Sequence, residues 1–272
     1  QNRQTGETFP YQLKTPIEVV WESTPTADME EINGLNLTSD FNFLVVSQMS
    51  VRKNFVNTIQ WWVEEFIDQD VGLIVKTNIT GNSRMDLDRT TEQLTNILSK
   101  YPDRKCKVYL LHGDLSAGQM RWMYNHEKIK ALINLAHGEG FGLPLFEAAR
   151  EALPVITIGW SGQVDFLCHE GKDYFSKVEH KLLPVQQEAV WKGVIEKESM
   201  WAFADQGSYK MTLRKSYKNY DDLKKTALEL QEIISENFSS EVLYSGFVNS
   251  IYEFNDPDSW LNELDDIIEE YE

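Results

Sequence analysis

Short apolar runs rich in β-branched residues alternate with amphipathic segments through the middle of the chain, and this alternation constrains the fold more than any other feature. Parallel strands are buried on both faces by their crossover helices, so such runs are typical of a doubly wound parallel sheet. We therefore expect an α/β fold, a Rossmann-like doubly wound parallel sheet. The predicted strands cover residues 43–47, 71–76, 107–111, 130–135 and 154–158.

The segments between these strands carry helical signals. Residues 53–67 repeat apolar side chains on one helical face, and a second apolar stripe ends just before Pro102. Ser116 and Gln119 have the spacing of a capping box at the start of a short helix. Proline suits the first turn of a helix, so Pro144 indicates that a further helix begins there.

The two ends of the chain lack this alternation. Residues 1–40 contain few periodic apolar positions and are predicted to be a connector with one short strand at 17–21. The core domain is predicted to cover residues 41–236, with only helices after residue 200. Residues 237–272 are predicted to form a helical C-terminal tail.

Charge and cysteine content limit the partners of this chain and its compartment. The net charge is −17, which would repel the phosphates of nucleic acids and anionic membranes, so we expect no nucleic-acid partner. Cys106 and Cys168 stand alone, outside any metal-binding or disulfide pattern, and fit a reducing, cytoplasmic compartment. No signal-peptide pattern is visible, and the start at Gln1 suggests that the numbering begins inside a longer chain.

Residues 137–148 (HGEGFGLPLFEA) are the most informative segment of the sequence. They link a predicted strand to a predicted helix, and the glycines allow a ligand to approach the backbone closely. The free N–H groups before Pro144 form a site suited to a phosphate. Glu139 and Glu147 flank this loop, as a ligand with hydroxyl groups at both ends would require. The competing interpretation is an ordinary strand-to-helix turn with two solvated glutamates.

The complete string E-G-F-G-L-P-x-x-E resembles the Glu-x₇-Glu signature of glycosyltransferase family 4, a family of retaining GT-B enzymes, and the resemblance extends weakly over residues 40–255. It implies that the chain supplies the C-terminal, donor-binding half of a GT-B fold. Glu139 then contacts the transferred sugar as a catalytic residue, and Glu147 holds the ribose of the nucleotide. The rest of the donor-binding loop is Gly140, Phe141, Gly142 and Leu143.

The segment FLVVSQMSVRKN carries a second resemblance to this family. Lys53 occupies the position of the family's lysine, which we expect to be catalytic. Cations at a helix N-terminus oppose the helix dipole, so Arg52 and Lys53 need an anionic partner, which a diphosphate supplies. The family has an arginine where this chain has Gln48, a departure that weakens phosphate binding unless Arg52 compensates. The competing interpretation is a solvated basic helix start.

His112 follows the predicted strand at 107–111, in a stretch (VYLLHGDLS) that resembles the family's nucleobase edge. Two interpretations are open for it. His112 contributes to the base pocket as a donor-binding residue, or it is an ordinary hydrogen-bonded histidine.

The resemblance implies transfer of a sugar from a nucleotide-sugar donor, most simply a UDP- or GDP-sugar, with retention of configuration. No cofactor and no metal are expected. The acceptor is a glycan, a lipid or a protein, and the N-terminal acceptor domain lies in cis or in a separate chain. Two other functions remain open: an inactive nucleotide-sugar-binding module, favoured only by Gln48, and a GT-B-shaped epimerase. The last helix of GT-B enzymes commonly crosses back to the first domain, and Trp260, Leu264 and Ile268 form a face that would do so or cap its own domain.

Overall fold

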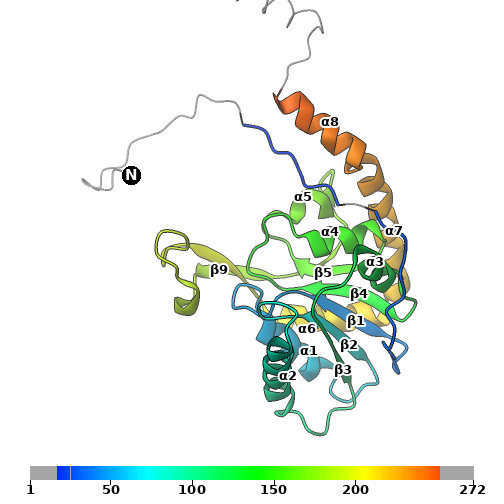
Figure 1. Ribbon diagram of the computed structural model, residues 1–272, viewed down its shortest axis with the longest axis vertical. Coiled ribbons are helices and arrows are strands. Elements are labelled where there is room, and N and C mark those ends of the chain that lie inside the picture. Colours follow the sequence, from blue (N-terminus) through cyan, green and yellow to red (C-terminus); the bar gives the residue numbers. More distant parts are fainter. Residues whose placement is uncertain (1–16, 25, 252–272) are drawn as a thin grey trace, which may run out of the picture. The chain divides into compact units, whose positions relative to one another are not determined.

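A computed structural model describes residues 17–24 and 26–251. Six parallel strands form one sheet in the order β3-β2-β1-β4-β5-β8 (Figure 1). This order confirms the Rossmann-like α/β fold expected from the sequence. The strands are β1 (Asn42–Val46), β2 (Gly72–Thr77), β3 (Lys107–His112), β4 (Ile129–Asn134), β5 (Val155–Ile158) and β8 (Ser176–Val178).

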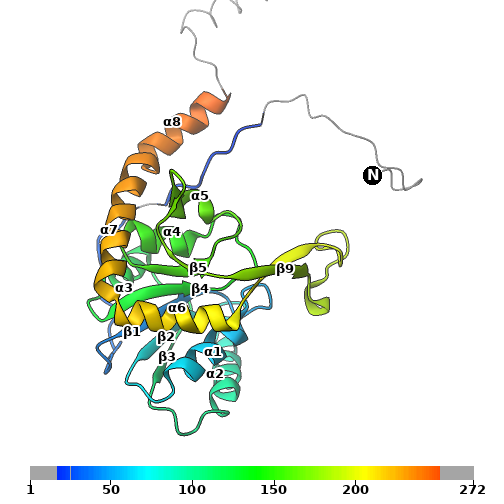
Figure 2. The ribbon, with the colours of Figure 1, turned by 180° about the vertical axis from the view of Figure 1, so that it is seen from behind.

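Helices cover both faces of the sheet. Side chains of successive strand residues point to opposite faces, so apolar strands make both faces apolar. In β1, Phe43 and Val45 belong to one apolar cluster, and Leu44 and Val46 belong to the other. Figure 2 shows α6 lying across the sheet on the first of these faces. The helices of that face are α1 (Phe55–Phe66), α2 (Arg84–Leu98) and α6 (Gln206–Lys218). The helices of the other face are α3 (Ala117–Asn125), α4 (Leu143–Arg150), α5 (Val164–Leu167) and α7 (Tyr220–Asn237).

The five predicted strands of the sheet lie within one or two residues of the observed ones, and the capping box of Ser116 and Gln119 is present. The strand predicted at 17–21 is wrong, because that segment has no regular secondary structure. Its apolar side chains have no sheet neighbour to pack against. Ile17 and Val19 are 71% and 68% exposed.

The prediction of helices alone after residue 200 is also wrong. β9 (His180–Pro184) and β10 (Met200–Ala204) pair antiparallel, and their hairpin projects from the sheet in both views (Figures 1 and 2). The loop between them contains the short 3₁₀ helix η1 (Gln187–Ala189). A second small hairpin is formed by β6 (Cys168–His169) and β7 (Lys172–Asp173). These strands are short and lack the buried apolar runs on which the strand predictions depended.

Residues 24–239 form one compact unit that contains the sheet and every predicted site residue. The other unit combines both ends of the chain, and its described part includes α8 (Ser240–Ile251). Leu243 is buried, whereas Phe247 and Ile251 are 52% and 58% exposed. The predicted face of Trp260, Leu264 and Ile268 lies outside the described residues. None of the described helices is long and apolar enough to cross a membrane.

Candidate functional site

The strand order of the sheet reverses between β1 and β4, and ligands of open α/β sheets bind outside the carboxyl ends of the strands at such a point. The chain leaves β1 toward α1 and β2, and it leaves β4 toward α4 and β5. The two departing loops are joined where the backbone N–H of His137 donates to the carbonyl oxygen of Arg52, at 2.9 Å. The loops after β1 and β4 therefore form one polar surface at the carboxyl edge.

Glu139 lies at the centre of this surface and accepts hydrogen bonds from both loops. Lys53 Nζ lies 2.5 Å from Glu139 Oε1, and Arg52 Nη1 lies 3.2 Å from Glu139 Oε2. Arg52 Nη1 also donates to the carbonyl oxygen of Gly138, at 2.7 Å. Asn134 Nδ2, at the end of β4, donates to Glu139 Oε1 at 3.1 Å. The structure thus brings together three residues that the sequence singled out separately.

Burial and ion pairing act in opposite directions on this cluster. Burial raises the pKa of Glu139, but the hydrogen bond and charge of Lys53, helped by Asn134, lower the pKa below its ordinary value. Burial lowers the pKa of Lys53 more than its hydrogen bond to Glu139 raises it. The Glu139 carboxylate is therefore ionised at neutral pH, with cations on two sides.

The loop after β5 fixes the backbone of Glu139. The N–H of Glu139 donates to Ser161 Oγ at 3.2 Å. The carbonyl oxygen of Glu139 accepts from Ser161 Oγ at 2.6 Å and from the Gly162 N–H at 3.1 Å. Ser161 has a φ of 76°, a conformation that few side-chain-bearing residues adopt. An added Cβ at Gly162 would lie 1.7 Å from the carbonyl oxygen of Gly140, so only glycine fits there. Three consecutive sheet loops thus hold Glu139 in place.

The glycine loop leads into α4 without a side-chain cap. Gly142 is the N-cap residue, has a φ of 94° and makes no side-chain cap hydrogen bond, and Pro144 stands in the first turn as expected. Gly140 is exposed with open space around its Cα, and Leu143 is 38% exposed. Uncapped N–H groups at a helix start attract anions.

Phe141 anchors this loop to the body of the domain. Its ring lies 5.1 Å from that of Phe146 and 5.0 Å from that of Phe166, in the apolar cluster beneath α4. The Phe141 ring therefore packs against the domain core and fixes the glycine loop to it.

A cavity of about 330 Å³ opens beside this cluster, at the carboxyl ends of β1 and β2. Arg52, Lys53 and Gln48 line it, as does Lys76, which the sequence analysis did not select. Within the part of the chain that the structure describes, Asp114 is the one carboxylate on its wall. Three cations around a polar cavity of this size suit an anionic ligand.

Glu147 lines a second cavity, of about 250 Å³, together with Tyr124 and Arg150. The hydroxyl group of Tyr124 donates to Glu147 Oε2 at 2.9 Å. Burial raises the pKa of Glu147 above its ordinary value, although the Tyr124 hydrogen bond and the charges of Arg150 and Lys76 act against the rise. The two glutamates of the sequence string thus differ in their surroundings: Glu139 is paired with cations, and Glu147 with a phenol.

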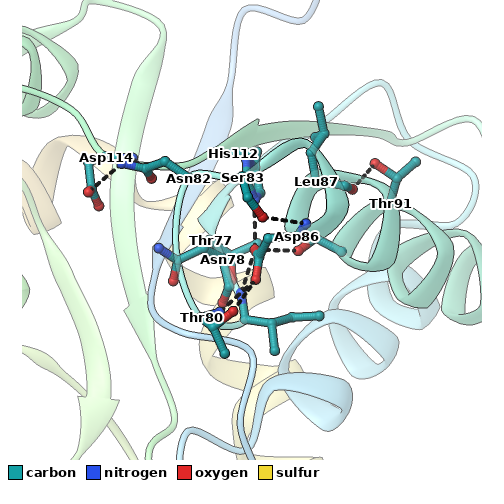
Figure 3. A network of polar contacts seen from close by, with 12 residues as sticks. Thr77, Asn78, Thr80, Asn82, Ser83, Asp86, Leu87, Thr91, His112 and Asp114 are labelled. Carbon is teal, nitrogen blue, oxygen red and sulfur yellow. Dashed lines mark hydrogen bonds and ion pairs between the residues drawn. The ribbon is translucent and has the colours of Figure 1, made fainter.

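His112 belongs to a buried polar network and lines neither cavity (Figure 3). Its Nε2 lies 2.8 Å from Asp86 Oδ1, and the backbone N–H groups of Ile79 and Thr80 also donate to Asp86. The His112 contact and these hydrogen bonds hold the pKa of Asp86 well below its usual range. This geometry agrees with the second interpretation, in which His112 is an ordinary hydrogen-bonded histidine. Through Asp86, His112 helps to hold the loop between β2 and α2.

Sequence reasoning missed Asn134, Ser161, Tyr124 and Lys76, which contact or surround the predicted site residues. Asn134 and Lys76 each occur where a buried apolar run ends, a position that signals the carboxyl edge of a parallel sheet. Nothing in the sequence reveals Tyr124, because its contact with Glu147 joins two different helices. Among the residues that the structure describes, no three His, Cys, Asp or Glu side chains are grouped as metal ligands would be. The expectation of a metal-free site stays a prediction.

No protein-family model matches the chain. A serotype-specific mannosyltransferase of Escherichia coli, WbdA, is 32% identical over 116 residues, which is 42% of this chain and 13% of that protein. The chain thus spans only a small part of the length of this relative.

Solved structures are similar in fold at low sequence identity. Sucrose-phosphate synthase from Thermosynechococcus elongatus has a TM-score of 0.57 and 14% identity, over 80% of this chain and 46% of that one. HepE from Anabaena, in complex with UDP and glucose, has a TM-score of 0.54 and 13% identity, over 80% and 49%. The lipopolysaccharide outer core galactosyltransferase WaaB has a TM-score of 0.51 and 14% identity, over 87% and 55%. The fold matches the Rossmann-like C-terminal domain of GT-B proteins.

Proposed function

We propose that this chain is the donor-binding half of a retaining GT-B glycosyltransferase of the family 4 type, which transfers a sugar from a UDP- or GDP-sugar. The observation that carries the proposal is the convergence of Arg52 and Lys53 on the buried carboxylate of Glu139, at the topological switch point of the sheet. A cation-lined cavity beside an ionised carboxylate suits a ligand that is anionic at one end and becomes positively charged at the other.

Stabilisation of the leaving group is the main task of such a site. When the bond between sugar and diphosphate breaks, negative charge develops on the diphosphate. Lys53 and Arg52 face the cavity that would receive it, and Gly142 begins an uncapped helix next to it. Fixed positive groups of this kind contribute strongly to catalysis because they need no reorganisation during the reaction. The proposal requires no metal and no cofactor.

Glu139 serves the sugar rather than the nucleotide in this proposal. The transition state of glycosyl transfer has oxocarbenium character, so a carboxylate near the anomeric carbon gains attraction as the bond breaks. Glu139 is fixed through its backbone by Ser161 and Gly162 and through its side chain by Lys53. A carboxylate held from both sides keeps its orientation when the donor enters.

Glu147 holds the ribose, with Tyr124 as its fixed hydrogen-bond donor. A carboxylate has more acceptor sites than one phenol occupies, so Glu147 can also accept from a ribose hydroxyl group. UDP in the HepE complex and the mannosyltransferase similarity support a nucleotide-sugar donor. In this proposal the acceptor, a glycan, lipid or protein, is bound by a second, N-terminal domain, and the enzyme works in the cytoplasm.

The alternative function, an inactive nucleotide-sugar-binding module, was suggested only by Gln48. The intact cluster of Arg52, Lys53 and Glu139 argues against it, because a module that only binds has no need of a carboxylate held between two cations.

Paired substitutions of the two glutamates test the proposal. Glu147→Ala should weaken binding of UDP or GDP by about 1.5–3 kcal/mol, the scale of a hydrogen bond to a charged group, and should do so with or without the sugar. Glu139→Gln keeps the shape and removes the charge, so free-nucleotide affinity should change little while transfer by the protein with its acceptor domain falls severely.

The measurements are calorimetric titration with UDP and GDP, and product analysis with a panel of nucleotide sugars, including the anomeric configuration. Glu92→Gln, on the exposed surface of α2, is the matched control and should leave both readouts unchanged. Equal effects of the two glutamate variants on affinity and on turnover would refute the division of roles. Failure of the wild-type chain to bind any nucleoside diphosphate would refute the proposed function.

A further inference from the structure

Lys76 is a cation of the cavity that the family pattern does not include. It lies in β2, paired in register with Val46 of β1, and the backbone N–H of Ser47 donates to its carbonyl oxygen at 3.2 Å. Its side chain is half-buried and lines the same cavity as Gln48. Gln48, in the loop after β1, and Lys76, in the neighbouring β2, thus face one cavity.

The other two cations of the cavity are already engaged. Lys53 and Arg52 both contact Glu139, at 2.5 and 3.2 Å. Among the described residues, Lys76 has no ion pair within 4 Å and no hydrogen bond from its amine. A lysine on the cavity wall without a protein partner has all three of its N–H donors available to an anionic ligand.

The charges around the cavity lead to the same conclusion. Arg52, Lys53 and Lys76 carry positive charge, and Asp114 and Glu139 carry negative charge, so the local balance is positive by a single charge. Without Lys76 the balance is zero, on a chain whose net charge is −17. A diphosphate would then have no net attraction to this cavity.

Lys76 also lies within electrostatic reach of the second cavity. Its positive charge lowers the pKa of Glu147, against the rise that burial causes. Lys76 therefore lines the first cavity and acts electrostatically on a carboxylate of the second. In the proposed function, one diphosphate joins the sugar near Glu139 to the nucleoside near Glu147.

We infer that Lys76 binds the diphosphate of the nucleotide-sugar donor and supplies the positive charge that Gln48 does not. This inference rests on the proposed function. The Nζ group donates hydrogen bonds to phosphate oxygens, while Arg52 and Lys53 divide their contacts between the phosphates and Glu139. Lys76 is thereby a phosphate-binding residue of the donor site.

Calorimetric titration of the 272-residue chain tests the inference. Lys76→Met keeps most of the side chain and removes the charge, and it should weaken UDP and GDP binding about tenfold or more. Uridine and guanosine lack phosphates, so their affinities should not change. Lys107→Met, at the amino end of the neighbouring β3, is the matched control and should bind all four ligands like the wild type.

A rescue variant separates charge from structure. Gln48→Arg in the Lys76→Met background places a cation on the same cavity wall and should regain much of the lost UDP or GDP affinity. Unchanged diphosphate binding by Lys76→Met overturns the inference while the proposed function stands. Equal loss of nucleoside and diphosphate binding, or no rescue by Gln48→Arg, also overturns it. Absence of nucleoside diphosphate binding by the wild type overturns the inference and the proposed function together.

Discussion

The two glutamates of the glycine loop have the same side chain but opposite electrostatic surroundings. Cations next to Glu139 lower its pKa, whereas burial beside Tyr124 raises the pKa of Glu147. Environments that push two carboxyl groups apart in pKa commonly mark two different roles. The difference is measurable in the free protein, before any ligand is added.

Stability measurements should therefore give opposite signs for the two residues. Glu147 has a raised pKa in the folded protein, so at a pH above the unfolded pKa of about 4.3 its ionisation favours the unfolded state. The group therefore lowers the stability of the folded protein at that pH. Glu147→Gln should then stabilise the free protein at pH 7.5 by about 0.5–2 kcal/mol, with the gain shrinking as the pH falls through the folded pKa toward the unfolded value.

Glu139→Gln should do the reverse. The folded pKa of Glu139 is lowered, so its contribution is present above the unfolded value and is lost as the pH falls through the folded pKa. At pH 7.5 the variant leaves Lys53 without its partner and should cost about 1–3 kcal/mol. Urea unfolding at pH 4.5 and 7.5 provides the measurement. Shifts of the same sign for both variants at pH 7.5 would contradict the environments described above.

For individual site residues, prediction from the sequence succeeded only in part. The resemblance selected Lys53, Arg52 and Glu139 from two distant segments, and the structure brings them into contact. It left His112 open between two interpretations, because a contact with Asp86 across 26 positions leaves no local signal. Lys76 does stand at the end of a buried apolar run, which marks the carboxyl edge of the sheet, but a lysine in that position looks solvated until its neighbours are known.

The elements that position the site are the three loops after β1, β4 and β5. The loop after β5 supports the glycine loop through Ser161 and Gly162, while β10 supports its start. The N–H of Ala202 donates to the carbonyl oxygen of His137 at 3.1 Å, and His137 Nδ1 lies 2.7 Å from the carbonyl oxygen of Ala202. The β9–β10 hairpin is thus joined to the glycine loop through the middle of β10.

Gly162→Ala should disturb this support. Its Cβ would lie 1.7 Å from the carbonyl oxygen of Gly140, so the glycine loop must move. Overpacking of this kind costs about 1–3 kcal/mol, and the displaced loop should lose affinity for UDP or GDP. Gly138→Ala, in the glycine loop itself, is the matched control, because its Cβ would meet only Ser161, at ordinary distances of 3.5 and 3.9 Å. Denaturant unfolding measures the stability of both variants, and calorimetry measures their affinity for UDP or GDP. Equal stability and equal affinity of the two variants would contradict the expected clash at Gly162.

Element prediction succeeded where burial dominates the sequence. The strands β1, β2, β4 and β5 are nearly continuous apolar runs because helices cover both faces, and such runs are visible without any tertiary information. β9 and β10 were missed because they form a partly exposed hairpin, in which Leu182, Leu183 and Met200 are 41%, 45% and 47% exposed. Their pairing spans a long loop that no turn motif announces.

For the molecule as a whole, the proposed function assigns only the donor side of a transfer reaction to the described residues. The sheet, both cavities and the cationic side chains that line them lie within residues 24–239. The structural relatives extend well beyond the matched region, since the chain covers 46% of sucrose-phosphate synthase and 55% of WaaB. In the GT-B resemblance the acceptor belongs to a second domain across a cleft. Under the proposed function, nucleotide binding and sugar transfer are therefore separable properties.

We expect residues 1–272 alone to bind a nucleoside diphosphate but to transfer no sugar. The basis is that Lys53, Arg52, Lys76 and Glu147 are all provided by this unit, whereas the proposed function assigns the acceptor to a second domain. An acceptor that is not positioned forfeits most of the rate. Calorimetry with UDP and GDP, paired with a transfer assay on the same preparation, tests both halves of the expectation. Lys53→Met is the control for specific binding and should lose affinity for the diphosphate. Robust turnover by residues 1–272 would show that the acceptor site lies within this chain and that the assignment to a donor-binding half is wrong.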